Sequence, residues 1–339
     1  MKTILVDGQW NLKRNFYKRK HVSAKGELCG GTFGFLDSLK TVINKTLPER
    51  VVVLWDGFHA GKYRYDIYPP YKANRKKNWD LEDRIISSNG MVTNEDDKEK
   101  AEIMRQKIKI QNYLEEIFVR QVEVDFVEAD DLIAYYILNS TITDEQIYIY
   151  SRDQDYFQLI SENVSIINPD SYDIITIDNF EKKFGYTVEN ELLLKCFEGD
   201  TSDCIKGVMG ISRKKLLKYF PEMANKKYLY ADLVEESLER KKKHKIKLYD
   251  SIIESSDVLY RNARLMNLKD PFVDDNAKAE MEKVIHGYLD CSRDIMSAMK
   301  TFTSDGYGPL LFNISVGDFF GPYYRLMIKE KEFQDKMKI

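Results

Sequence analysis

The chain has 339 residues, of which 43% are hydrophobic, and its formal net charge is −3. This hydrophobic content excludes global disorder and suffices for one large domain or two smaller ones. The near-neutral charge argues against a nucleic-acid partner, unless acidic residues gather at metal ions while basic residues gather elsewhere.

Two classes of protein are disfavoured by the residue pattern. The four cysteines stand far apart without a C-x-x-C pair, so we expect neither zinc nor a disulfide framework, and reduced thiols fit the cytoplasm. Asp7 interrupts the first apolar run after six residues, so this run is no signal peptide. No apolar stretch approaches the roughly 20 residues that cross a bilayer.

Apolar runs alternate with helical patterns over the first 190 residues. Helical spacing of apolar residues predicts helices over residues 33–46 and 101–118, and a third helix begins near Asp130. Strands are predicted over residues 2–7, 51–55, 122–127, 147–150, 164–167 and 174–177. This alternation predicts an α/β fold with a mainly parallel sheet flanked by helices.

The chain after residue 190 looks mainly helical. Residues 191–197 precede a glycine-rich hairpin segment, residues 207–211, and Ser212 is expected to cap the basic helix that follows. We therefore predict an α/β core over residues 1–190 and a helical region over residues 191–339. The basic run over residues 240–247 is typical of a solvated helix face, and contact with a duplex is the alternative.

Nine carboxylates recur near the ends of these segments, and the first seven lie in or just after apolar runs. They are Asp7, Asp56, Glu128, Asp130, Asp131, Asp153, Asp155, Asp200 and Asp203. In an open α/β sheet the crevice lies outside the carboxyl ends of the strands, so we expect these side chains to meet there. Two like charges about 4 Å apart repel by roughly 4 kcal/mol at an effective dielectric near 20. All-oxygen sites of this kind suit Mg²⁺ or Mn²⁺.

Taken singly, the motifs differ in how specifically they indicate a metal site. An Asp-Gly pair after a strand, as at Asp7 and Asp56, is more often a turn. Three acids between residues 128 and 131 exceed what helix capping needs, which favours metal ligation. Asp153 and Asp155 after a strand are also typical of a phosphatase or a glycosyltransferase, but the other carboxylates come from different segments.

Two basic stretches fit a phosphate backbone. Between residues 62 and 77 cations interleave with aromatics, which suits phosphates and stacked bases, although a solvated loop is the plainer alternative. Around residue 210 a Gly-x-x-Gly segment exposes backbone amides to a phosphate. Its basic neighbours are Lys206, Arg213, Lys214, Lys215 and Lys218.

Taken in order, the motifs resemble the 5′ nuclease family, which includes flap endonucleases, phage 5′-exonucleases and the 5′-nuclease domain of bacterial DNA polymerase I. The matching segments are residues 6–8, 55–57, 71–75, 128–131, 153–155 and 199–211. The resemblance runs from residue 1 to about residue 220. The compact chain without a polymerase looks most like the stand-alone phage enzymes. The fold it implies is resolvase-like and PIN-related, with a helix–hairpin–helix element and a helical C-terminal part.

The resemblance implies two divalent ions, Mg²⁺ with Mn²⁺ as a substitute. One would be held by Asp7, Asp56, Glu128 and Asp130, and the other by Asp153, Asp155, Asp200 and Asp203, with Asp131 near both. Lys72 and Arg75 align with the basic catalytic pair near the scissile phosphate, and residues 72–110 with an arch or clamp. Residues 199–218 look like the helix–hairpin–helix element, which in the family often holds K⁺. The nucleic-acid contacts it suggests are Arg64, Tyr71, Lys76, Lys77, Gly207, Gly210, Ser212, Arg213, Lys214 and Lys215.

The predicted function is a structure-specific 5′ nuclease, a 5′-3′ exonuclease or flap endonuclease. Its expected partners are DNA with 5′ flaps or ends, RNA primers on DNA, and replication proteins. We expect a monomer in the cytoplasm, or in a host cytoplasm for a phage protein. Two alternatives stay open: a Mg²⁺-dependent phosphatase, and a non-catalytic module that binds structured DNA.

Overall fold

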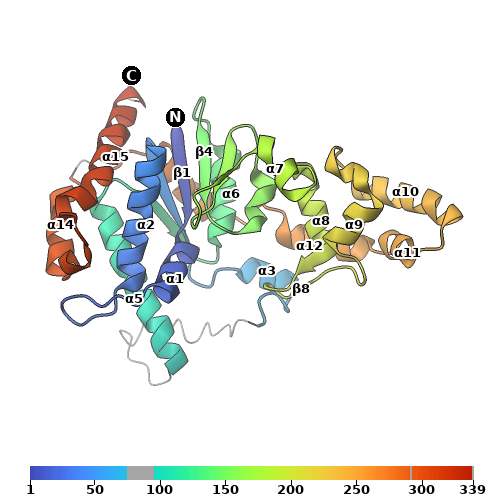
Figure 1. Ribbon diagram of the computed structural model, residues 1–339, viewed down its shortest axis with the longest axis horizontal. Coiled ribbons are helices and arrows are strands. Elements are labelled where there is room, and N and C mark those ends of the chain that lie inside the picture. The colour runs from blue at the N-terminus through green and yellow to red at the C-terminus, as the bar shows by residue number, and fades with distance from the viewer. Residues whose placement is uncertain (75–94, 291, 338–339) are drawn as a thin grey trace.

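A six-stranded sheet forms the centre of the computed structural model, which describes residues 1–74, 95–290 and 292–337 (Figure 1). The strand order is β3-β2-β1-β4-β5-β6, with β1 to β5 parallel and β6 antiparallel to β5. The strands are β1 (Lys2–Asp7), β2 (Arg50–Asp56), β3 (Arg120–Val124), β4 (Gln146–Tyr150), β5 (Val164–Ile167) and β6 (Ile174–Ile175). The predicted α/β class with a mainly parallel sheet is confirmed.

Alternate residues of the central strands pack on opposite faces of the sheet. Ile4 and Val6 share a hydrophobic cluster with α2 (Gly30–Thr46), α5 (Glu95–Glu116), α14 (Ile295–Ser304) and α15 (Val316–Met337). Leu5 belongs to the cluster of the other face, which includes α6 (Ala129–Asn139) and α13 (Asp275–His286). Because both faces are covered, these strands need apolar side chains at every position, which is why they read as unbroken apolar runs.

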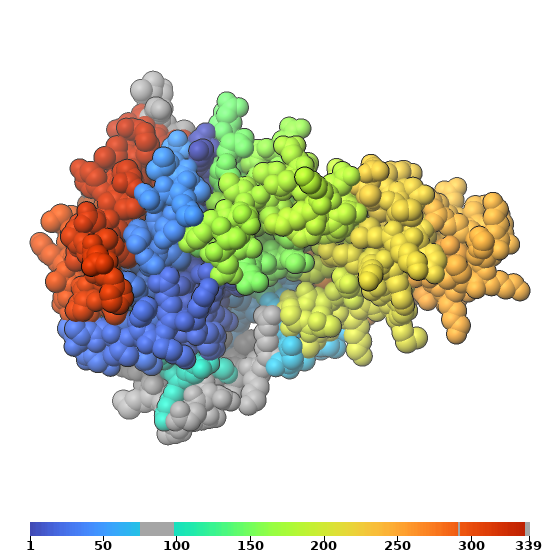
Figure 2. All heavy atoms as spheres, viewed as in Figure 1, coloured from blue at the N-terminus to red at the C-terminus, as the bar shows by residue number. Residues whose placement is uncertain are grey.

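A helical arm extends from one end of the sheet along the longest axis of the molecule (Figures 1 and 2). A short antiparallel pair, β7 and β8, connects its helices α8 and α9, and α10 and α11 lie at its outer end. Its elements are α7 (Ile177–Phe184), α8 (Glu191–Glu198), β7 (Gly199–Asp200), β8 (Ile205–Lys206), α9 (Arg213–Tyr219), α10 (Tyr230–Lys243), α11 (Lys247–Ile253) and α12 (Ser256–Met266). Two further helices lie near the carboxyl edge of the sheet, α1 (Gly8–Lys18) and α3 (Lys62–Ile67).

The predicted boundaries differ most at one helix and two strands. The helix expected over residues 101–118 is α5, which begins six residues earlier, at Glu95, and ends at Glu116. The strand expected over residues 122–127 is β3 and ends at Val124, because the chain then turns through Phe126, whose φ is 69°. The strand expected over residues 174–177 ends at Ile175, because Thr176 and Asn179 form a capping box that starts α7. The expected Ser212 cap is present, and its Oγ accepts a hydrogen bond from Lys215 N.

The last three helices return to the core instead of extending the arm. α15 packs on α2, α14 on α5 and α13 on β3. At the edge of the sheet opposite Asp7, the buried Glu330 of α15 pairs with Arg120 of β3 and lies 3.6 Å from Arg50 of β2. The last three helices therefore belong to the packing of the core, and the domain boundary at residue 190 stays a prediction. Among the described residues, no helix is long and apolar enough to cross a membrane.

Candidate active site

Two of the predicted carboxylates lie side by side because they end adjacent parallel strands. Asp7 ends β1 and Asp56 ends β2, and Asp7 is in register with Leu54. Each also caps a helix: Asp7 Oδ1 accepts from Trp10 N at 2.9 Å, and Asp56 Oδ1 accepts from Ala129 N at 2.9 Å. The same contacts that start α1 and α6 therefore hold these carboxylates at the carboxyl edge of the sheet.

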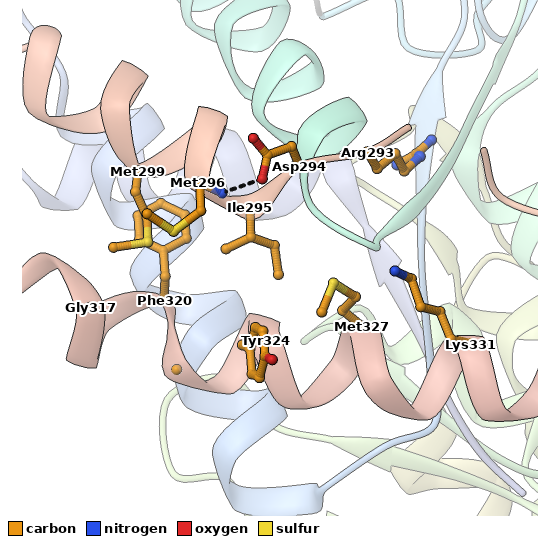
Figure 3. Close-up of a pocket in the computed structure, with 11 residues that line it drawn as sticks. Arg293, Asp294, Ile295, Met296, Met299, Gly317, Phe320, Tyr324, Met327 and Lys331 are labelled. Carbon is orange, nitrogen blue, oxygen red and sulfur yellow. Dashed lines mark hydrogen bonds between the residues drawn. The ribbon is translucent and has the colours of Figure 1, made fainter. Parts of the chain in front are cut away.

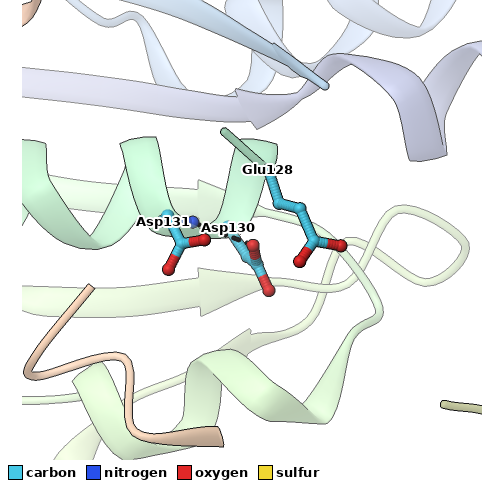
Figure 4. A group of neighbouring side chains, drawn as sticks. All are labelled: Glu128, Asp130 and Asp131. Carbon is cyan, nitrogen blue, oxygen red and sulfur yellow. Dashed lines mark hydrogen bonds between the residues drawn. The ribbon is translucent and has the colours of Figure 1, made fainter. Parts of the chain in front are cut away.

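Glu128, Asp130 and Asp131 form an acidic group at the start of α6 (Figure 4). One ligand oxygen from each lies within 4.8 Å of the others. Glu128 is 5% exposed and accepts hydrogen bonds from the Tyr71 hydroxyl at 3.0 Å and from the Lys72 ammonium. Burial alone would raise the pKa of Glu128, but Lys72 and Arg64 outweigh it and hold this pKa at about 2.

Protein donors engage both oxygens of Asp131, as they do for Glu128. Arg64 donates to Oδ1 and Oδ2, and Phe272 N donates to Oδ1 at 3.0 Å. The Arg64 guanidinium is only 3% exposed and also bonds Glu128 and the carbonyl of Leu265. Asp131 and Arg64 thus form a buried support beneath the acidic group, and Asp131 as a metal ligand stays a prediction.

A second acidic group follows β4 and extends into the β7–β8 hairpin. Asp153 Oδ1 accepts from Asp155 N at 2.9 Å at the start of the 3₁₀ helix η1 (Gln154–Leu159). Asp155 contacts the ammonium of Lys195, and Asp200 Oδ2 lies 3.2 Å from the same Nζ. Lys195 comes from α8, and its side chain is 8% exposed. This buried lysine therefore joins η1 to the hairpin through two carboxylates.

Lys72 connects the two groups. Its ammonium contacts Glu128 and lies 3.8 Å from Asp203 Oδ2, while its backbone N donates to Asp203 O at 2.8 Å. Lys72 has a φ of 51°, which costs a non-glycine residue about 1–3 kcal/mol and is retained only where the surroundings enforce it. Asn74 Nδ2 adds a bond to Ser202 O at 3.2 Å, so this loop and the hairpin are fixed to each other.

Tyr156 shows that the acidic residues converge. Its buried hydroxyl donates to Asp7 Oδ2 at 3.3 Å. Burial raises the pKa of Tyr156, and four surrounding carboxylates raise it further; these are Asp7, Asp130, Asp153 and Asp56. The N-terminal, central and post-strand acids thus surround one tyrosine. With the Lys72 contact to Asp203, all the predicted segments meet at one edge of the sheet.

In the metal-free protein the ionised forms of Asp7 and Asp130 are disfavoured, because both carboxylates are buried close to other acidic side chains. Burial raises the pKa of Asp7 to about 7, and the charges of Asp56 and Asp153 contribute. Burial also raises the pKa of Asp130, and Asp131 and Glu128 add to the effect although Arg64 opposes it. A site of this kind favours cations strongly.

A polar cavity of about 640 Å³ opens beside the second acidic group, in reach of a ligand. Its lining includes Trp10, Asp153, Asp155, Lys195, Asp200 and Arg213. Another cavity, of about 440 Å³, lies between α14 and α15 and is lined mainly by methionine and aromatic side chains (Figure 3). It holds one carboxylate, Asp294, whose Oδ1 accepts from Met296 N and caps α14.

Comparisons with known proteins agree with this geometry. The sequence profile of the 5′-3′ exonuclease N-terminal resolvase-like domain matches residues 2–185. The chain belongs to the 5′-3′ exonuclease family. This membership confirms the predicted 5′ nuclease.

Three relatives illustrate the range of the family. A 5′-3′ exonuclease of Buchnera aphidicola is 25% identical over 236 residues, which cover 68% of this chain and 73% of the relative. A thermostable DNA polymerase I of Thermus filiformis is 28% identical over 232 residues, but this match spans only 25% of the polymerase. The solved structure of the phage T5 5′-exonuclease with bound zinc has a TM-score of 0.62 at 19% identity, covering 90% of this chain and 98% of that one. The last comparison confirms the predicted resolvase-like fold.

The structure describes the predicted nucleic-acid contacts except Lys76 and Lys77. Arg64 and Tyr71 are 3% and 2% exposed and bond Glu128, so they support the acidic group, and their contact with nucleic acid stays a prediction. Arg213 is half-buried and pairs with Glu191 at 2.9 Å, which anchors α9 to α8. Lys214 and Lys215 are exposed, and the exposed Gly210, in the loop between β8 and α9, has a φ of 80°. Arg75, Lys76 and Lys77 lie outside the described residues, as does much of the expected arch.

Sequence reasoning missed Lys195 and Tyr156. Lys195 interrupts the apolar side of α8, where a charged residue needs a buried partner, and this was a usable signal. Tyr156 directly follows Asp155, but tyrosine is common beside strands, so its position gave no hint of its contact with Asp7.

Proposed function

We propose that this protein is a divalent-metal-dependent 5′ nuclease that hydrolyses phosphodiester bonds at the 5′ ends or flaps of duplex DNA. The observation that carries the proposal is the convergence of carboxylates from β1, β2, α6, η1 and the β7–β8 hairpin on Tyr156 and Lys72. Apolar side chains would stabilise the fold at this edge better than a buried cluster of carboxylates does, so a role in ligand binding explains the cluster better.

The donor set fits hard divalent cations. Asp7, Asp56, Glu128 and Asp130 would hold one ion, and Asp153, Asp155, Asp200 and Asp203 would hold the other; all donors are carboxylate oxygens, as Mg²⁺ and Mn²⁺ prefer. Burial, with the charges of Asp56 and Asp153, raises the pKa of Asp7 to about 7, which supports a bound cation at this position. When bound, the ions would lower the pKa of water and stabilise charge on the phosphoryl oxygens.

Lys72 contacts both acidic groups, which supports a role for its ammonium at the scissile phosphate. Although burial lowers the pKa of Lys72, Glu128 and Asp203 outweigh burial and raise it, so the ammonium stays charged. A fixed cation at this position would stabilise negative charge that grows on the phosphoryl oxygens. Arg75 as its partner remains a proposal from the family pattern.

The hairpin between α8 and α9 is the proposed duplex contact. A side chain at Gly207 would collide with the Glu198 carbonyl, at 2.3 Å from its Cβ, so the close backbone approach there requires glycine. The exposed backbone at Gly210, together with Ser212, Lys214 and Lys215, would bind phosphates without reading bases. K⁺ at the hairpin is part of the proposal.

A cleavage assay with end-labelled flap, blunt, nicked and RNA–DNA substrates, with and without Mg²⁺, tests the function. We expect Mg²⁺-dependent products that start at 5′ ends or flaps, and Asp153→Asn with Asp155→Asn should abolish them while binding persists. Full activity of this double variant would refute the ligand assignment. Binding without cleavage in both Mg²⁺ and Mn²⁺ would point to the DNA-binding module, and turnover of a small phosphoester alone to the phosphatase. Cleavage of the RNA–DNA substrate shows whether the protein removes RNA primers. Gel filtration shows whether it is a monomer.

A further inference from the structure

Basic residues continue past the hairpin onto the outer end of the arm. α9 carries Lys214, Lys215 and Lys218, all exposed. The segment that joins α10 to α11, residues 240–247, contains one arginine, five lysines and one histidine; we call it the basic tip. Residues 213–220 and 240–249 contain no acidic residue, although the whole chain is slightly acidic.

Packing places the basic tip next to the end of α9. The Arg240 guanidinium donates to the carbonyl of Tyr219 and lies 4.6 Å from the ring centroid of Phe220. The rings of Tyr219 and Tyr249 meet edge to face at 6.2 Å. α9 has seven residues, so it is about 10 Å long. The tip therefore lies about 10 Å from the start of α9, a distance that equals the length of about three base pairs at 3.4 Å each.

Half of the six arginine and lysine side chains of the basic tip are paired inside the protein. Arg240 pairs with Glu236, Lys241 with Asp250 and Lys242 with Glu239. For Lys243, Lys245 and Lys247, which are exposed, no described carboxylate lies within ion-pair distance.

Helix electrostatics do not explain these lysines either. Lys243 is in the last turn of α10, where a cation is favourable. Lys245 and Lys247, however, stand just before and at the start of α11, where the helix dipole disfavours positive charge. These lysines lie in a segment between α10 and α11, at the outer end of the arm (Figures 1 and 2), and a basic cluster at this position fits an external polyanion.

We propose that the basic tip is a second duplex-binding surface, which contacts backbone phosphates of the flap-bearing duplex beyond the hairpin. This inference rests on the proposed function and extends it, because it predicts that binding depends on how far the duplex continues. Each lysine that neutralises a phosphate releases a counterion, so the contact is sensitive to salt and blind to sequence.

Binding of duplexes of two lengths tests the surface. The variant Lys243→Gln, Lys245→Gln, Lys247→Gln and the wild type are titrated, without metal, against flapped DNA whose flap-bearing duplex has about 6 or about 20 base pairs, at 3.4 Å each. On the long duplex we expect the slope of log K against log salt to shrink by about 2 to 3, and the affinity to fall by about tenfold to a hundredfold. On the short duplex both should stay at the wild-type value.

The matched control is the variant Lys182→Gln, Lys183→Gln, which replaces two exposed lysines in the last turn of α7. It should bind both duplexes with the affinity and the salt slope of the wild type. An unchanged slope on the long duplex, or an equal loss on both lengths, would overturn the inference. Thermal unfolding of the three proteins shows whether the variants fold alike. Cleavage by the wild type in Mg²⁺ is scored separately: absence of cleavage would sink the proposed function, while a length-dependent loss of binding would still support the surface.

Discussion

Lys195 Nζ lies 3.2 Å from Asp200 Oδ2 and also contacts Asp155, so a buried lysine takes a position between two proposed metal ligands. Burial raises the pKa of Asp200, but the Lys195 charge outweighs it and lowers this pKa. In the metal-free protein the Lys195 ammonium partly neutralises the two carboxylates, as a bound metal ion would. The two carboxylates can be shared between the ammonium and a bound ion.

Replacing Lys195 by methionine should destabilise the metal-free protein far more than the metal-bound protein. The change leaves Asp155 and Asp200 without a buried partner, and breaking such a pair costs about 3–5 kcal/mol, less here because the carboxylates are partly exposed. Mg²⁺ should then raise the unfolding temperature more in the variant than in the wild type, as measured by calorimetry. Lys195→Arg, which keeps the charge, is the control, and an equal response to Mg²⁺ in all three proteins would contradict the idea.

Lys72→Ala should slow single-turnover cleavage by about a hundredfold to a thousandfold, the usual effect of losing a preorganised group that stabilises charge in the transition state. Affinity for the flapped substrate should change little, because one ammonium is a small part of the phosphate contacts. Lys62→Ala is the matched control: Lys62 lies on α3, its side chain is 36% exposed and it pairs with Asp66. A wild-type rate in Lys72→Ala would remove this residue from the mechanism.

Asp130 and Asp131 are adjacent in the chain, but we expect Asp131 to stabilise the fold and Asp130 to bind metal. Asp131→Asn should lower the free energy of unfolding by about 1–3 kcal/mol, because it weakens the buried bonds to Arg64 and Phe272 N. Asp130→Asn should stabilise the metal-free protein, because its charge is disfavoured there, and yet abolish Mg²⁺-dependent cleavage. Chemical unfolding and cleavage rates measure both. If Asp131→Asn kept full stability and lost all activity, Asp131 would be a ligand after all.

The positions of the carboxylates could be predicted because strand ends are visible in the sequence. Asp7 and Asp56 follow apolar runs, and parallel strands bring such ends to one edge. Asp200 and Asp203 could be placed only by resemblance, since nothing local says that the hairpin docks on Lys72.

The roles of the surrounding residues depend on contacts far along the chain, which is why they were missed. Arg64 looked like a surface cation, but Leu265 and Phe272, some 200 residues later, enclose it with Asp131. A chain of mixed polar helices gives little sign of where it packs, so the return of α13, α14 and α15 to the core was not predicted either.

The raised pKa of Asp7 predicts competition between protons and metal. With a folded pKa near 7 and an ordinary value of 3.8, this carboxyl stays protonated in the metal-free fold at pH values where it ionises in the unfolded chain. The native state then binds more protons, so stability of the metal-free protein should fall as pH rises from about 4 to about 7. Mg²⁺ binding requires the ionised form, so its apparent affinity should weaken by up to about tenfold per pH unit below about pH 7. Calorimetry across this pH range, with and without Mg²⁺, measures both effects.

Asp7→Asn should remove this pH dependence of metal-free stability, because the asparagine does not titrate. Asp170→Asn is the control: Arg14 and Lys18 hold the pKa of Asp170 at about 2, so it is ionised throughout the range and its loss should leave the pH profile unchanged in shape. If stability of the metal-free wild type rose between about pH 4 and pH 7, Asp7 would have to ionise normally in the fold. The acidic edge would then be more solvated than its contacts with Tyr156 and Trp10 N indicate.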